Sequence, residues 1–90
     1  MAYTTEQIKA EIKKLIAKVS ERETDEIGDA AHYLEELGID SLMGMEIMIA
    51  VDRKFKIDIP EEEFAQASCI NESVALVEKW LSTKEAGAAA

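Results

Sequence analysis

The sequence has one cysteine, one proline and one histidine, and it has far fewer basic than acidic residues. A single cysteine excludes a disulfide framework and a cysteine-rich metal site within one chain, and a lone thiol fits the reducing cytoplasm that we expect for this protein. A net charge of −9 makes nucleic acid an unexpected partner, because phosphate binding needs a basic face. No apolar run approaches the roughly 18 residues of a membrane span, and no secretory leader is visible, so we expect neither.

What is present indicates one folded domain with a modest core. The chain has 90 residues, and 48% of them are hydrophobic. The acids are concentrated: residues 21–46 contain nine acids and one base, whereas residues 1–20 contain four lysines and two glutamates. This concentration favours a basic protein surface as a partner. The alternative is that the acids only keep the domain in solution.

Apolar spacing predicts an all-α fold, a small bundle of three main helices plus one short helix, with a long first loop. The main helices are expected at residues 5–20, 41–55 and from 68–70 to 82. Thr4 and Gln7 fit a capping box at the first of them. Pro60 is expected as the first residue of the short acidic helix at 61–65. We assign residues 1–82 to one domain and predict that residues 83–90 are a disordered tail.

The long loop at residues 21–40 has no sustained periodicity, so side chains must hold it against the core. Residues expected to do so, with a short helical turn at 33–37, are Ile27, Tyr33, Leu34 and Leu37.

The helix at residues 41–55 carries two apolar stripes. One stripe contains Ile47, Val51 and Phe55 and is predicted to face the core. The other contains Leu42, Met45 and Ile49, is flanked by Glu46, Asp52 and Arg53, and is predicted to be an exposed binding patch. A helix buried on two sides is the alternative.

Residues 37–42 read Leu-Gly-Ile-Asp-Ser-Leu and place Ser41 at the start of this helix, directly after Asp40. The first turn of a helix has unpaired N–H groups and a partial positive charge, so it stabilises an anion such as a phosphate diester. A plain turn and helix cap would also explain the segment. The segment closely resembles the Asp-Ser-Leu attachment site of acyl carrier proteins, and the longer run Asp-Ser-Leu-Met-Gly-Met-Glu resembles the carriers of polyketide synthases.

The resemblance covers roughly residues 5–82 and implies a carrier without catalytic residues or a metal site of its own. Ser41 would bear a 4′-phosphopantetheine arm derived from coenzyme A, and the arm would hold acyl groups as thioesters for polyketide or fatty-acid synthesis. Asp40 would assist the phosphopantetheinyl transferase, which in this family uses magnesium. Other expected partners of the monomer are ketosynthases, acyltransferases and acyl-activating enzymes. The face that they grip would contain Leu42, Met45, Glu46, Ile49 and Asp52.

Arg53 departs from the family pattern, because fatty-acid carriers often have an acid there. Four other functions stay open at this stage. A peptidyl carrier of a nonribosomal synthetase is similar, but Ile39 and Asp40 argue against it. A serine hydrolase using Ser41 and His32 lacks the Gly-x-Ser-x-Gly elbow. A calcium sensor lacks the ligand spacing of a calcium loop, and a helical adaptor without a prosthetic group would use only the exposed stripe.

Overall fold

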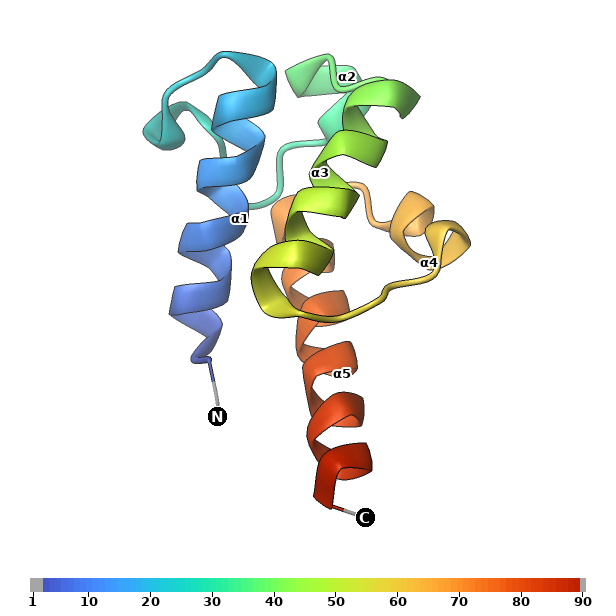
Figure 1. Cartoon of the computed structure of the whole chain (residues 1–90). Helices are drawn as coiled ribbons and strands as arrows, with labels where there is room; N and C mark the ends of the chain where they lie inside the picture. The colour runs from blue at the N-terminus through green and yellow to red at the C-terminus, as the bar shows by residue number, and fades with distance from the viewer. Residues whose placement is uncertain (1–2, 90) are drawn as a thin grey trace.

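A computed structural model describes the backbone of residues 3–89 and the side chains of residues 3–83. The described chain is all helical and has no strand, which confirms the predicted fold class. The elements in chain order are α1 (Thr5–Ser20), η1 (Thr24–Glu26), α2 (Tyr33–Leu37), α3 (Ser41–Phe55), α4 (Glu61–Gln66) and α5 (Ile70–Ala89). In Figure 1, α1, α3 and α5 form the bundle, and α4 lies beside α3 and α5.

The first helix has the predicted bounds and the predicted cap. The N–H of Gln7 donates to Thr4 Oγ1 over 3.1 Å, and the N–H of Thr4 donates to Gln7 Oε1 over 2.9 Å. This capping box satisfies two N–H groups that a bare helix end leaves unpaired. Ile8, Ile12 and Ile16 recur along one face and are fully buried against α3 and α5.

The long connection between α1 and α2 is held to the bundle by apolar and charged contacts. Ile27, Tyr33 and Leu37 are buried, as predicted. The prediction for Leu34 is wrong, because this side chain is 60% exposed. The physical reason is the geometry of the short helix α2: residues four apart share a face, so when Tyr33 and Leu37 face the core, Leu34 points about 100° away from Tyr33 and about 60° away from Leu37.

Both predicted stripes of α3 lie where the periodicity places them. Ile47, Val51 and Phe55 are buried, and the ring of Phe55 packs edge-to-face on Tyr3 with centroids 4.9 Å apart. On the opposite side, the exposed stripe of Leu42, Met45 and Ile49 is open to solvent. The helix is therefore buried on one side only.

Two predicted boundaries need correction. Pro60 is the N-cap of α4 and not its first helical residue, which is Glu61. The helix predicted to end near Ser82 continues to Ala89, because no proline interrupts this alanine-rich segment and lysine, glutamate and alanine all favour helix. Disorder of residues 83–90 in solution stays a prediction. Within the described residues, no helix combines the length and the apolar character needed to cross a bilayer.

Candidate functional site

A tight turn between α2 and α3 places Ser41 at the surface. Gly38 ends α2 in the left-handed conformation, with φ of 67°, and its N–H bonds to the carbonyl of Tyr33. Glycine adopts this conformation without the steric cost that a side chain would add. Ile39 then turns inward and is buried, so the following residues, Asp40 and Ser41, are exposed.

Asp40 is the N-cap of α3. Its Oδ1 accepts a hydrogen bond from the N–H of Met43 over 2.9 Å, and its carbonyl accepts one from Gly44 over 2.8 Å. The N–H groups of Ser41 and Leu42 precede this first intrahelical bond and point out of the helix end. The hydroxyl of Ser41 thus stands at the positive end of a helix of four turns, where an anion is stabilised.

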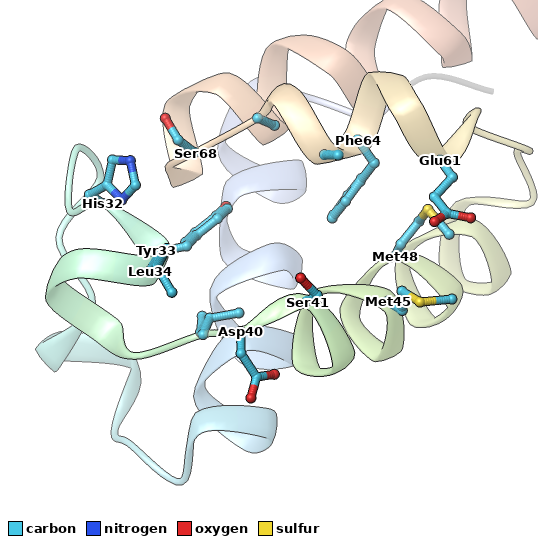
Figure 2. A pocket seen from close by; sticks show the side chains of 14 residues that line it. His32, Tyr33, Leu34, Asp40, Ser41, Met45, Met48, Glu61, Phe64 and Ser68 are labelled. Carbon is cyan, nitrogen blue, oxygen red and sulfur yellow. The ribbon is translucent and has the colours of Figure 1, made fainter.

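A hollow of about 490 Å³ lies beside Ser41. Figure 2 shows Met45 and Met48 on α3, Phe64 reaching from α4, and Tyr33 and Leu34 on α2 around this space. The connection between α4 and α5 closes it with Ala67 and Ser68. The lining is more apolar than polar. Such a hollow can hold a slender chain with an apolar end.

The exposed stripe lies on α3 next to this hollow. Leu42 is 68% exposed, Ile49 49% and Met45 42%, and Met45 also lines the hollow. Glu46 and Arg53 are exposed on the same side of the helix. This side of α3 therefore presents apolar side chains and charges of both signs, from Leu42 beside Ser41 to Arg53 about three turns further along the helix.

Asp52 differs from the other residues assigned to the partner face. It is half-buried, and its Oδ1 accepts a hydrogen bond from the N–H of Ile59 over 3.1 Å. Burial raises the pKa of this carboxyl, although the bond from Ile59 opposes the shift. The structure thus gives Asp52 a contact that holds the connection between α3 and α4.

His32 and the acidic side chains bear on the alternative functions, a hydrolase and a metal-binding protein. His32 caps α2, and its Nδ1 accepts a hydrogen bond from the N–H of Glu35 over 3.3 Å. His32 and Ser41 both line the hollow, but no hydrogen bond joins them in the described part of the chain. Within residues 3–89, no three His, Cys, Asp or Glu side chains gather to hold a metal ion.

The hollow is not predictable from the spacing of apolar residues, because its walls come from three separate elements, α2, α3 and α4. Of the lining residues, Tyr33 is predicted only as a core residue, and Phe64 falls within the short helix predicted at residues 61–65. Periodicity identifies the buried face of each helix, but it does not say where two faces fail to meet. The nearest signal in the sequence is the stripe predicted to be exposed, because Met45 of this stripe also lines the hollow.

Comparison with known proteins gives one family. Residues 10–77 match the model of the phosphopantetheine attachment site. The chain is 30% identical to an acyl carrier protein of Rhodococcus erythropolis over 79 residues, which are 88% of this chain and 87% of the relative. It is 36% identical to the acyl carrier protein AcpXL of Brucella melitensis over 73 residues, covering 81% and 76% of the two chains. It is 32% identical to the meromycolate extension acyl carrier protein of Mycolicibacterium smegmatis, covering 88% and 80%.

Proposed function

Because the chain belongs to the acyl carrier protein family, whose members carry covalently attached 4′-phosphopantetheine, we propose that Ser41 is the residue that bears this group. The observation that supports the assignment is the place of Ser41: exposed, first in α3, and beside the hollow. Ser41 also lies inside the segment that matches the family.

The residues around Ser41 fit the group. The phosphate diester would lie at the helix end, where the N–H groups of Ser41 and Leu42 are available and the helix dipole is positive. The exposed hydroxyl is accessible to a modifying enzyme. The hollow offers an apolar space within reach of the arm, next to Met45, Met48 and Phe64.

When bound, the arm supplies a thiol that holds an acyl group as a thioester. The chain itself fixes the attachment point, because the Asp40 cap orders the first turn of α3. Tethering raises the effective concentration of the acyl group at each partner without requiring tight binding. We propose that residues 1–82 form the carrier domain and that the acyl group goes to polyketide or fatty-acid biosynthetic enzymes.

The proposed partner face consists of Leu42, Met45, Glu46, Ile49 and Asp52. The three apolar side chains are exposed together on α3 and would form a small desolvated centre when covered. Glu46 would steer a basic partner, whereas Asp52 would contribute less because its carboxylate already binds Ile59. The partners proposed are a phosphopantetheinyl transferase, ketosynthases, acyltransferases and acyl-activating enzymes.

The assignment of Ser41 is tested by intact mass spectrometry after incubation with coenzyme A and a broad-specificity phosphopantetheinyl transferase. The wild-type chain is expected to gain the mass of one phosphopantetheine. Ser41→Ala is expected to fold normally and gain none, whereas the matched control Ser20→Ala is expected to be modified like the wild type. Modification of Ser41→Ala would contradict the assignment.

A further inference from the structure

The short helix α4 forms the wall of the hollow that faces α3. Glu61, Phe64 and Ala65 of this helix line the space, and Phe64 points from α4 toward it in Figure 2. A six-residue helix is not stable by itself, so contacts with the rest of the protein must set its position. The depth of the hollow therefore depends on what holds α4.

Both ends of α4 are held through its connecting segments. Before the helix, the N–H of Ile59 donates to Asp52 Oδ1 over 3.1 Å. After it, the N–H of Ser68 donates to Glu72 Oε1 over 2.7 Å, and the carbonyl of Ser68 accepts from the N–H of Tyr33 over 2.8 Å. These bonds fix where α4 begins and ends, but none of them involves a side chain of α4 that would set the rotation of the helix about its axis.

A polar contact in the middle of α4 restricts that rotation. Glu63 Oε1 accepts a hydrogen bond from Lys79 Nζ over 3.0 Å and another from Trp80 Nε1 over 3.1 Å, both from α5. Lys79 also lies 5.7 Å from the centroid of the Trp80 ring, within the range of a cation–π contact. We name Glu63, Lys79 and Trp80 the α4 clamp.

The clamp and the wall of the hollow lie on different faces of α4. Glu63 and Phe64 are consecutive, so their side chains point about 100° apart around the helix axis. Glu63 is directed at α5, whereas Phe64 is 7% exposed and lines the hollow. Rotation of α4 that carried Glu63 away from Trp80 would also move the Phe64 ring.

We propose that Glu63 is a positioning residue that, by accepting hydrogen bonds from Lys79 and Trp80, holds α4 in the orientation that keeps Phe64 in the hollow. Release of the clamp enlarges the space beside Ser41 for an apolar group. The consequence for a tethered acyl chain rests on the function proposed above, but the control of the hollow by Glu63 does not.

The test uses the full chain in a Ser41→Ala background, so that its outcome does not depend on an arm. Glu63→Ala removes both hydrogen bonds of the clamp. Trp80→Phe keeps an aromatic ring but removes the indole N–H. Glu63 then keeps only its hydrogen bond from Lys79. Glu62→Ala is the matched control, since it removes the same charge from an exposed neighbour in α4.

Two measurements decide the outcome: amide hydrogen exchange by NMR, and binding of the neutral apolar dye N-phenyl-1-naphthylamine. In Glu63→Ala, the α4 amides of Glu63 and Phe64 are expected to exchange about three- to tenfold faster, while amides of α1 and α3 keep their rates. The dye is expected to bind severalfold more tightly. In Trp80→Phe, amide exchange and dye binding are both expected to change less than in Glu63→Ala. In Glu62→Ala, neither is expected to change.

Three results would overturn the proposal. If amide exchange in Glu63→Ala becomes faster by the same factor in α1, α3 and α4, Glu63 supports only global stability. Unchanged exchange in α4 would show that Phe64 packing alone sets its position. Unchanged dye binding, with faster exchange confined to α4, would show that motion of α4 does not open the hollow.

Discussion

Asp52 combines a structural hydrogen bond with a charge that its surroundings disfavour. Its carboxylate binds the N–H of Ile59, yet burial raises its pKa. An acid whose pKa is raised on folding weakens the folded state at pH values above that pKa, and the penalty vanishes below the unfolded value, near 3.8. The hydrogen bond, by contrast, needs only an oxygen acceptor.

We therefore expect Asp52→Asn and Asp52→Ala to have different effects. The asparagine keeps an acceptor and removes the charge, so its free energy of unfolding at pH 7 should equal or exceed that of the wild type. The alanine leaves the Ile59 N–H unpaired and should lose about 0.5–1.5 kcal/mol. Urea denaturation at pH 7 measures both, and an asparagine variant less stable than the alanine variant would contradict the argument. At pH 3.5, the difference in free energy of unfolding between Asp52→Asn and the wild type should be smaller than at pH 7.

The two stripes of α3 allow a matched comparison of core and surface positions. Val51 and Phe55 are 0% and 2% exposed. Val51→Ala and Phe55→Ala should each reduce the free energy of unfolding by roughly 2–5 kcal/mol, since each leaves a cavity in the core. Ile49→Ala, on the exposed stripe of the same helix, should change it by about 0.5 kcal/mol or less. Thermal or urea melts measure the stability of all three variants. Similar losses of stability in Ile49→Ala and Val51→Ala would show that the two stripes do not differ in burial.

At the scale of elements, an ion-pair cluster holds the long connection to α1. Asp29 binds Lys13 Nζ over 2.6 Å and Lys9 Nζ over 2.9 Å. The hydrogen bonds from Lys13 and Lys9 lower the pKa of Asp29, and the bond to Asp29 raises the pKa of Lys9. The N–H of Asn71 also donates to the carbonyl of Asp29 over 3.0 Å. Asp29 therefore joins the connection between α1 and α2 to α1 through its carboxylate and to α5 through its carbonyl oxygen.

The cluster predicts how stability depends on pH. A lowered pKa in Asp29 means that its contribution is fully present above pH 3.8 and is lost as the pH falls through the folded-state value. The raised pKa of Lys9 means that its contribution is present below pH 10.5 and is lost as the pH rises through the folded-state value. Asp29→Asn should thus be less stable than the wild type at pH 7 and approach it as the pH falls below 3.8. Asp25→Asn, an exposed acid of the same connection, is the control.

The sequence contains enough information to locate the helices, because apolar spacing and caps are local properties. Thr4 and Gln7 marked the start of α1, and Asp40 with Ser41 marked the start of α3. Leu34 was misplaced because a five-residue helix has too few apolar positions to define a face. The role of Glu63 was missed because Lys79 and Trp80, which bind it, lie in a different helix. Contacts of this kind depend on how the helices are arranged, which periodicity alone does not give.

At the scale of the whole molecule, the candidate site lies at one end of the bundle. Figure 1 shows the start of α3 beside α2, while the start of α1 and the end of α5 lie at the opposite end. A partner approaching Ser41 would meet α2 and the start of α3, and not the start of α1 or the end of α5. The acids of residues 21–46 belong to this half of the molecule, which gives a basic partner a long-range attraction toward it.

The proposed partner face predicts a charge-dependent rate of loading. Glu46→Lys reverses an attractive charge, and Met45→Glu places a charge in the apolar centre, so both should slow loading of Ser41 by a phosphopantetheinyl transferase severalfold or more. Both side chains are exposed, so thermal stability should change little. Arg53→Glu should speed loading if the transferase surface is basic throughout and slow it if an acid of the transferase pairs with Arg53.

The dependence of the loading rate on salt separates electrostatic steering from direct contact in the same experiment. Screening weakens interactions between exposed charges, so the defect of Glu46→Lys should shrink between low and moderate ionic strength, whereas that of Met45→Glu should largely persist. Glu62→Lys carries the same charge change on α4, outside the proposed face, and should load at a rate near the wild type. If Glu46→Lys and Met45→Glu load as fast as this control, the exposed stripe of α3 is not the surface that the transferase binds.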